Sequence, residues 1–429
     1  MRTITMKRVS GLVAMLFLAL QPSSARADVP VAARPARSAS DVTDGFGVVA
    51  HLSYGGTPYV TRFTEVAQKL DALGVKWIRT RLYPDNTAQI QRMLTLCRDQ
   101  GIKFNLVVGT PLSNDIAQVH TLVATTLAGC IGSVEGANEW NLKDRPNWVN
   151  EVLAHQRELW QTFRGDPRTA GLPVLAPALG KPLRADFEAL GLTGINQYVS
   201  HGNIHLYPGG EVPTRMLTDV LSWERDLVLN NTAKPIITTE AGYHNAMNAP
   251  TGGHYPTTEK AAGLYHPRML MEHLTHGVKR MFNYEFLDQS VDTVDLEQNF
   301  GLLRNDLTQK PSFNALRNTL HVFQDTARAA PGTLTYGIES AVEVQHAAFR
   351  LSDGSYIVAM WRNVHVYDRQ TRTDLVVEPV PVTLRLGEPA FVTTYRPSLQ
   401  TASTGGTTVK VTARGFQMPG DLYLIHVHQ

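Results

Sequence analysis

The chain has 429 residues, of which 43% are hydrophobic and 18% are charged. This length suffices for one large domain and a smaller one, and the composition excludes an intrinsically disordered chain and a coiled coil. The formal charge of +2 depends on four basic residues within positions 1–27, and without them it is −2. No basic run then remains, so neither nucleic acid nor an anionic membrane surface is expected as the principal partner.

Residues 1–27 have the three parts of a secretory signal peptide. Basic residues precede the apolar run 11–20, and a small-residue A-x-A pattern ends at Ala27. An apolar run of this length is too short to cross a bilayer, which takes about 20 residues, and no later stretch is long enough. We therefore predict cleavage after Ala27 and a secreted or periplasmic protein with no membrane span after removal of the signal.

The next segments alternate between strand-like and helix-like patterns. Residues 28–44 lack periodicity and predict a leader or linker. Over residues 45–328, short β-rich runs alternate eight times with helical periodicity, which predicts an α/β fold of the (β/α)₈ TIM barrel type. A doubly wound sheet is the alternative, but no Gly-rich phosphate loop follows any strand. The predicted strands are 46–52, 75–83, 103–109, 133–137, 174–178, 198–207, 235–240 and 280–286, and the clearest helices are 61–73, 87–100, 148–163, 216–230 and 258–277.

Residues 329–429 have a different pattern. Alternating runs such as 342–349, 355–361, 374–377, 382–386 and 422–428 are separated by Gly, Pro and Asp turn signals, which predicts a small all-β sandwich of about 100 residues. We expect this accessory domain to cover part of the outer surface of the barrel.

The chain has only two cysteines, Cys97 and Cys130. An oxidising compartment would permit one bridge between them, but two unpaired buried thiols are the favoured interpretation. Neither cysteine lies in a motif that would lower the pKa of its thiol for catalysis.

Two predicted barrel strands end in a glutamate. The fourth leads into Asn138-Glu139, and the seventh ends in Thr239-Glu240. Active sites of barrels lie at the C-terminal ends of the strands, so both carboxyl groups are expected at the same mouth. Glycosidic cleavage uses two carboxyl groups, one to protonate the leaving oxygen and one to attack the anomeric carbon or activate water. We therefore predict Glu139 and Glu240 as the catalytic pair.

The chain resembles the clan A glycoside hydrolases, which are retaining enzymes on (β/α)₈ barrels, with similarity to families 39 and 5. Asn138-Glu139 matches the Asn-Glu pair after strand four, which implies that Glu139 is the acid/base and that Asn138 holds the 2-hydroxyl of the sugar. Glu240 matches the strand-seven nucleophile. Arg79 and the His205-Leu206-Tyr207 run resemble the residues that support the nucleophile and line the site. The resemblance continues to Phe300-Gly301-Leu302-Leu303 and the Lys310-Pro311 helix start.

The chain departs from the family pattern after strands four and eight. Trp140 stands where Pro is usual, and the strand-eight Trp is missing, so the expected sugar platform is Trp140, Tyr284 or Phe286. Flat C–H faces of sugars stack on aromatic rings. The further substrate-binding candidates near strand ends are His51, Tyr54, Tyr83, Tyr243, His244 and His254.

Charge considerations define the expected protonation states. Glu139 must hold a proton before reaction, so its pKa is expected to be raised by a neighbouring ionised Glu240. Arg79 and Tyr207 are expected to keep Glu240 ionised. Glu135 lies deeper in the same strand as Glu139, so we expect it to be buried and paired with Arg79 or Arg81.

Together these observations predict an exported retaining glycoside hydrolase that cleaves a β-linked poly- or oligosaccharide by double displacement, with no cofactor. Metal is not expected, because the run from Glu272 to His276 lacks the spacing of a zinc motif. Two alternatives remain: a transglycosylase that remodels an envelope or exopolysaccharide, and a non-catalytic carbohydrate-binding protein on the same scaffold.

Overall fold

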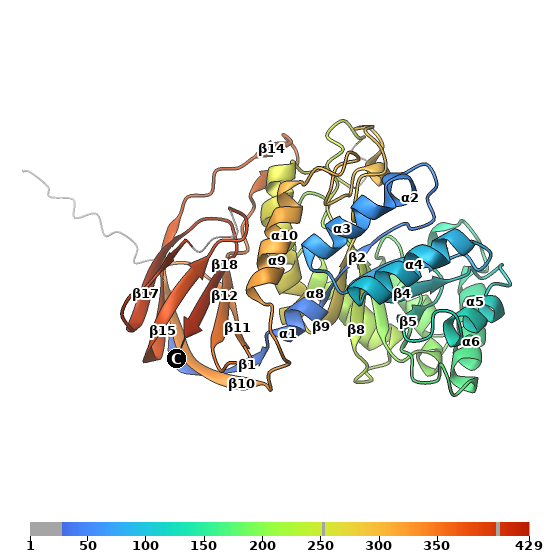
Figure 1. The fold of residues 1–429 in the computed structure, drawn as a ribbon, viewed down its shortest axis with the longest axis horizontal. Coiled ribbons are helices and arrows are strands. Elements are labelled where there is room, and N and C mark those ends of the chain that lie inside the picture. The colour runs from blue at the N-terminus through green and yellow to red at the C-terminus, as the bar shows by residue number, and fades with distance from the viewer. Residues whose placement is uncertain (1–27, 251–253, 400–403, 429) are drawn as a thin grey trace, which may run out of the picture.

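The structure is a computed structural model that describes residues 28–250, 254–399 and 404–428. The signal peptide predicted over residues 1–27 lies outside the described residues. An α/β barrel occupies one side of the molecule and a β domain the other (Figure 1). Among the described residues, no helix is both long and apolar enough to span a membrane.

The barrel is a sheet of eight parallel strands in the order β6-β5-β4-β3-β2-β9-β8-β7. A parallel bridge between Leu175 and His201 joins the two ends of this sheet. The order follows the chain around a ring, so the predicted barrel is confirmed and the doubly wound sheet is wrong. Its strands are β2 (Phe46–Val49), β3 (Trp77–Leu82), β4 (Lys103–Val108), β5 (Ile131–Glu135), β6 (Val174–Leu175), β7 (Gly202–Leu206), β8 (Ile236–Ala241) and β9 (Val278–Asn283).

Helices surround this sheet and bury their apolar faces on it. In one of them, the Asn86 side chain caps the N-terminus by accepting from the Gln89 N–H, and Gly101 ends the helix in the left-handed conformation. Ile90, Met93 and Leu94 of the same helix recur at helical spacing and are buried. The main helices are α3 (Phe63–Leu73), α4 (Thr87–Gln100), α5 (Ile116–Ala124), α6 (Trp148–Gly165), α7 (Arg184–Gly191), α8 (Leu217–Trp223), α9 (Glu259–Thr275) and α10 (Pro311–Val322). Short helical segments are α1 (Ser40–Asp44), α2 (Pro58–Thr61), η1 (Trp140–Leu142), η2 (Ile195–Tyr198) and η4 (Leu296–Gln298).

The helix predicted over residues 216–230 changes type part of the way along. Helix α8 is followed by a π-helical segment, η3 (Glu224–Val228). The Glu224 carboxylate is buried and accepts a hydrogen bond of 3.0 Å from the Asn203 N–H of β7. Burial raises the pKa of Glu224 to about 8, and the Asn203 hydrogen bond offsets only part of this effect.

The β domain is one eight-stranded sheet that closes on itself. Strand β10 pairs with both β1 and β15, so the strands form a circuit around an apolar core, which accounts for the predicted sandwich. Its strands are β1 (Val29–Ser38), β10 (Gly332–Ser340), β11 (Gln345–Arg350), β12 (Tyr356–Trp361), β15 (Val380–Tyr395), β16 (Gly405–Gly406), β17 (Val411–Met418) and β18 (Tyr423–His428). A separate two-stranded hairpin consists of β13 (Tyr367–Asp368) and β14 (Thr373–Asp374).

The segment predicted as a leader is instead part of this β domain. Strand β1 runs antiparallel to β10 and parallel to β11, with Ala36 opposite both Gly332 and Ala348. The prediction of a linker over residues 28–44 is therefore wrong for Val29–Ser38. Alternation of exposed and buried residues is weak in this strand, because only its last part enters the core.

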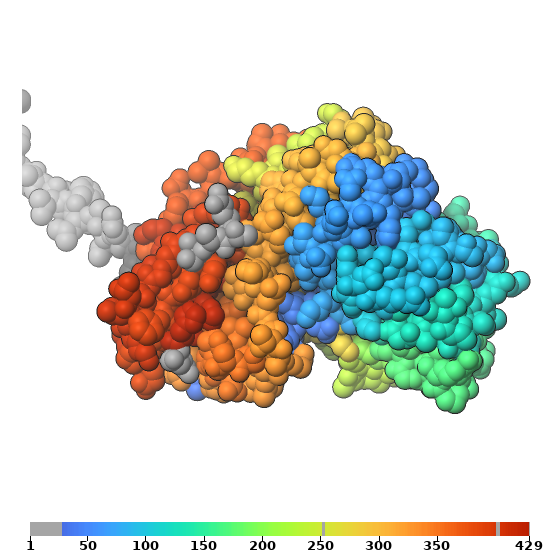
Figure 2. Space-filling view, in the orientation of Figure 1, coloured from blue at the N-terminus to red at the C-terminus, as the bar shows by residue number. Residues whose placement is uncertain are grey.

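The β domain packs against α9 and α10 of the barrel. Trp361 of β12 is buried and donates a 2.6 Å hydrogen bond to Glu272 of α9. Arg268 of α9 is also buried and donates to the carbonyl oxygens of Gly420 and Val364. The space-filling view shows the two parts pressed together along this boundary (Figure 2). The β domain therefore covers part of the outer surface of the barrel.

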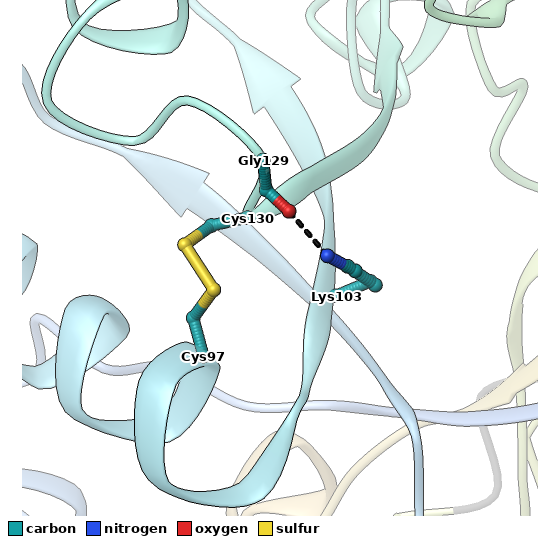
Figure 3. Close-up of a disulfide and its surroundings, with 4 residues drawn as sticks. All are labelled: Cys97, Lys103, Gly129 and Cys130. Carbon is teal, nitrogen blue, oxygen red and sulfur yellow. Dashed lines mark hydrogen bonds between the residues drawn. A yellow bond between two sulfur atoms is a disulfide. The ribbon is translucent and has the colours of Figure 1, made fainter.

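The two cysteines form a disulfide. Cys97 lies in the last turns of α4, and Cys130 immediately precedes β5. Their Cα atoms lie 5.6 Å apart, within the range that a disulfide spans. Lys103 donates to the carbonyl of Gly129 beside the bridge (Figure 3). The favoured prediction of two free thiols is wrong, because packing of α4 on the sheet brings the end of this helix to the start of β5.

Candidate active site

A cleft with a volume of about 610 Å³ lies at the C-terminal ends of the barrel strands. This is the end where barrel enzymes hold their substrates. Eight of the ten predicted site residues line it: His51, Arg79, Asn138, Glu139, His205, Tyr207, Glu240 and Tyr284. Tyr54, Tyr83 and His254, which were also considered from the sequence, line the same cleft.

Arg79 is the central cation at the floor of this cleft. Its guanidinium donates to Glu135 through Nε and Nη2, to Glu240 through Nη1 at 2.5 Å, and to Asn138 through Nη2 at 2.6 Å. Burial opposes the charged form of Arg79, but the charges of Glu135 and Glu240 raise its pKa above the ordinary value. Glu135 is buried and paired with Arg79, as predicted. One fixed cation therefore serves two carboxylates.

Glu240 is held by donors on both of its oxygens. Arg79 donates to Oε1, and the Tyr207 hydroxyl donates to Oε2. Gly242 follows the end of β8 and lies close to the backbone of Tyr284. A Cβ atom at position 242 would lie only 2.1 Å from the Tyr284 carbonyl oxygen. Glycine at this position permits β8 and β9 to bring Glu240 and Tyr284 to the same part of the cleft. The carboxylate is thus oriented by one hydrogen bond to each of its oxygens.

Glu139 occupies an unusual backbone conformation beyond the end of β5. Its φ angle is 48°, in the left-handed region that non-glycine residues rarely adopt. Its N–H donates to the Ala178 carbonyl at 2.9 Å, and Asn138 forms a parallel bridge with Ala178. Because Asn138 accepts from Arg79 through Oδ1, its amide nitrogen is the group left to donate to a substrate hydroxyl. Neighbouring backbone contacts therefore hold Asn138 and Glu139 in place.

A buried chain of hydrogen bonds defines the protonation of His205. Asn203 donates through its amide nitrogen to the Ala176 carbonyl and accepts from the Thr239 hydroxyl, at 2.7 Å. Thr239 must then accept from His205 Nε2, which lies 3.0 Å away. His205 Nδ1 lies 2.7 Å from Glu139 Oε1. One proton is consequently shared between His205 and Glu139.

The pKa of Glu139 differs from the expected direction. Burial raises it, but the hydrogen bond from His205 and the charge of this imidazolium outweigh burial, so the net shift is downward. The pKa of His205 is raised, because Glu240 and Glu139 together outweigh the effect of burial. The predicted upward shift of Glu139 is therefore wrong, and the two pKa shifts favour the shared proton on His205.

Aromatic side chains form one wall of the cleft. The Tyr284 ring lies 6.1 Å from Tyr207, 5.3 Å from Phe300 and 5.7 Å from His51, in edge-on contacts. His51 also stacks on Tyr54 at 4.3 Å. Burial lowers the pKa of His51 to about 4, so this imidazole is neutral near pH 7. Tyr284, one of the predicted platform residues, lines the cleft, whereas Phe286 is fully buried in the barrel core.

Two of the predicted substrate-binding residues do not line the cleft. Trp140 begins the 3₁₀ segment η1, and its indole N–H donates to Glu151 at 2.7 Å, within a separate apolar cluster. Tyr243 is 2% exposed, stacks on Tyr265 and donates to the Glu211 carbonyl. Both predictions are wrong because the chain turns after each strand and directs these rings into the packing between loops.

The cleft also contains residues that the sequence interpretation missed. Glu297, in η4, is a third carboxyl group, and it remains exposed to the cleft. Partial burial and the charges of Glu240 and Glu139 raise its pKa to about 7. Phe300, Leu142 and the two cations Arg81 and Lys181 also line the cleft. Glu297, Leu142 and Lys181 lie outside the motifs used above, whereas Phe300 lies within the Phe300-Gly301-Leu302-Leu303 run without having been recognised as a cleft residue.

One group of side chains has the geometry to bind a cation. Within the described ranges, an oxygen of Glu139, a nitrogen of His205 and an oxygen of Glu240 lie within 4.8 Å of one another. Arg79 and Tyr207 already satisfy the oxygens of Glu240, and the positive charge of Arg79 would repel a metal ion there. This arrangement fits acid/base chemistry better than metal binding.

No protein-family model matches the chain, and no curated protein is detectably similar to it in sequence. Solved structures do match. A family 39 glycoside hydrolase from Bacteroides cellulosilyticus aligns with a TM-score of 0.58 and 14% identity, over 92% of this chain and 82% of that chain. A glucosidase from Croceicoccus marinus gives a TM-score of 0.60 at 11% identity, over 92% of this chain and 97% of that one.

A third structure extends the same comparison. A glycoside hydrolase family 30 endoxylanase from Clostridium papyrosolvens has a TM-score of 0.55 and 11% identity, over 94% of this chain and 98% of that chain. These alignments span both the barrel and the β domain. The chain therefore shares its two-part fold with these glycoside hydrolases.

Proposed function

We propose that this protein is a retaining glycoside hydrolase acting on a poly- or oligosaccharide, with Glu240 as nucleophile and Glu139 as acid/base. The observation that carries the proposal is the spacing of the two carboxyl groups. An oxygen of Glu139 and an oxygen of Glu240 lie within 4.8 Å of one another. Retaining enzymes need carboxyl groups about 5–5.5 Å apart, whereas inverting enzymes leave about 6.5–9.5 Å for a water.

The reaction would proceed in two displacements. First, a Glu240 oxygen bonds to the anomeric carbon while the glycosidic C–O bond breaks and Glu139 gives its proton to the leaving oxygen. The proton shared with His205 is the one available for this transfer. Next, Glu139 takes a proton from water, the water oxygen bonds to the anomeric carbon, and the bond to Glu240 breaks. The expectation of a β-linked substrate stays a prediction.

The neighbouring residues support these roles by charge and by hydrogen bonding. Arg79 and Tyr207 stabilise the charge of Glu240 before attack and after its release. The free amide N–H of Asn138 is available for the 2-hydroxyl of the reacting sugar. A carbohydrate-binding protein without activity would not require two carboxyl groups at this spacing.

Export is part of the same proposal. Disulfides persist in oxidising compartments such as the periplasm or the cell exterior. The Cys97–Cys130 bridge therefore supports the proposed secretory signal, with cleavage after Ala27. Mass spectrometry of the protein secreted from its native host would test this, since a mature N-terminus elsewhere than Asp28 contradicts the cleavage site.

The first experiment is to incubate the protein with a panel of polysaccharides and 4-nitrophenyl glycosides and follow product size and anomeric form. Glu240→Gln should lower kcat at least about 10⁴-fold. Glu139→Ala should lower it about 10²–10⁴-fold, and azide should restore part of the rate, because azide attacks the glycosyl-enzyme without a base. Glu158→Gln, an exposed change on α6, is the matched control.

Two results would contradict the proposal. Ordinary activity of Glu240→Gln would exclude this residue as nucleophile, and a product of inverted anomeric form would exclude double displacement. The transglycosylase alternative predicts longer products at high acceptor concentration with the same two residues.

A further inference from the structure

A hairpin of the β domain reaches the mouth of the barrel. We call residues 363–374, which include β13 and β14, the mouth hairpin. Thr258 caps the N-terminus of α9 and donates to Asp374 of this hairpin. Helices of a (β/α)₈ barrel begin on the side where the strands end, so this contact lies on the side of the cleft. Figure 1 shows β14 beside the upper end of α9.

Arg372 holds the loop that follows β8. Its guanidinium donates to the Met247 carbonyl and, at 2.9 Å, to the Ala249 carbonyl. Such bonds restrain the backbone itself, and a charged donor makes them stronger than bonds between neutral groups. The loop is the direct continuation of the strand that carries Glu240.

Arg369 contacts a second loop at the mouth of the barrel, the loop that follows β7. It forms a 2.8 Å ion pair with Glu211, in the loop after β7, and its guanidinium lies 4.9 Å from the centre of the Tyr255 ring. Gly210 packs closely between Arg369 and Tyr255. A Cβ atom at position 210 would lie 3.1 Å from the Arg369 Cβ and 3.2 Å from the Tyr255 Cβ. The hairpin therefore contacts both loops that follow the strands bearing Tyr207 and Glu240.

These contacts lead directly to His254, which lines the cleft beside Tyr255. The His254 ring lies 5.4 Å from the Tyr207 ring in an edge-on contact. Its carbonyl accepts a hydrogen bond of 3.2 Å from the buried His244. Among the described residues, no hydrogen bond is made by the His254 ring itself. The ring is thus free to contact a substrate, provided that its backbone is held.

We propose that the mouth hairpin belongs to the catalytic apparatus, with Arg369 and Arg372 as positioning residues that hold His254 against Tyr207 in the cleft that contains Glu139. The kinetic consequence rests on the proposed function, whereas the structural one does not. Tyr207 donates to the proposed nucleophile, so movement of His254 away from Tyr207 would change the surroundings of Glu240. The β domain would then do more than cover the barrel.

The test uses the full-length variants Arg372→Gln and Arg369→Gln. Arg385→Gln is the matched control, because it removes an exposed Arg–Glu339 ion pair between β10 and β15 of the same domain. Hydrogen exchange is measured first, since it needs no substrate. The amides of Asn248, Ala249 and Thr257 should exchange about tenfold faster in Arg372→Gln and be unchanged in the control.

Kinetics provide the second measurement, on whichever glycoside of the panel the parent protein cleaves. We expect kcat to fall about 10- to 100-fold in each variant while KM changes less than about threefold and the melting temperature follows the control. Arg372→Lys should restore part of the rate by donating to one of the two carbonyls.

Unchanged exchange in both arginine variants would overturn the inference. An equal rise in exchange throughout the barrel, with a lower melting temperature, would also overturn it by showing general destabilisation. A parent protein that cleaves nothing in the panel would contradict the proposed function, and the exchange measurement would still decide the role of the hairpin.

Discussion

The barrel and the β domain differ in the range of the contacts that build them. Barrel strands pair mostly with the next strand along the chain, as β3 does with β4 and β4 with β5. The β domain closes through β1, whose Ala36 lies opposite Gly332 and Ala348. Local patterns therefore suffice to recognise the barrel, whereas the β domain depends on a segment whose partners lie at the other end of the sequence.

Ala36→Asp tests this dependence most severely. Ala36 is 1% exposed within the β-domain core, so an unpaired carboxylate there should lower the free energy of unfolding by about 4 kcal/mol or more. Urea unfolding followed by circular dichroism measures the loss. Val31→Asp, on an exposed part of the same strand, is the control and should change it by less than about 0.5 kcal/mol. Equal stability of both variants would show that β1 is dispensable.

Removal of the disulfide tests a contact inside the barrel between residues that lie closer in sequence than β1 and β10 do. The bridge joins residues 33 positions apart. Cys97→Ser with Cys130→Ser should lower the free energy of unfolding by about 3–4 kcal/mol, because the unfolded chain gains freedom. Urea unfolding with and without reductant measures this. Reductant should lower the free energy of unfolding of the parent protein and leave that of the double variant unchanged. An equal free energy of unfolding for the parent protein with and without reductant would contradict a stabilising bridge.

The pH dependence of Glu224→Gln gives the smallest and most specific effect. The folded pKa of Glu224 is about 8, against 4.5 for an ordinary glutamate side chain, so between these values the folded state keeps a proton that the unfolded state releases. Stability due to this group is present below pH 4.5 and falls by about 1.4 kcal/mol per pH unit above it. Gln does not titrate.

The free-energy difference between Glu224→Gln and the parent should therefore grow in favour of the variant by about 2–3 kcal/mol from pH 5 to pH 7. Denaturant unfolding at the two pH values measures it, and all other titrating groups cancel because both proteins share them. A difference that does not change with pH would show that Glu224 is ionised in the folded protein.

The difference between local patterns and contacts of distant segments also explains which parts of the candidate site could be predicted. Glu139 and Glu240 were found because strand periodicity places them at the mouth of a barrel, and Arg79 was found through the family resemblance. Trp140 and Tyr243 follow strands equally closely, but their ring N–H and hydroxyl donate to Glu151 and Glu211 in neighbouring loops. No periodic pattern reports such contacts between loops.

Glu297 and the mouth hairpin were missed for a related reason. Glu297 lies in the long irregular segment between β9 and α10, where the sequence has no periodic pattern that predicts which side chains face the cleft. Arg369 and Arg372 belong to the β domain and act on the barrel, so their role depends on how two separately recognisable parts are packed. The shared proton of His205 likewise depends on Asn203 and Thr239, which come from two strands.

The position of β1 also has a consequence for biosynthesis. Ala36 is made 296 residues before its partner Gly332. At synthesis rates of about 5–20 residues per second, this strand waits roughly 15–60 s before its edge can be paired. All eight barrel strands are complete within this interval. The nascent chain therefore carries an open strand edge while its barrel matures, and a chaperone that binds extended segments has its longest opportunity there.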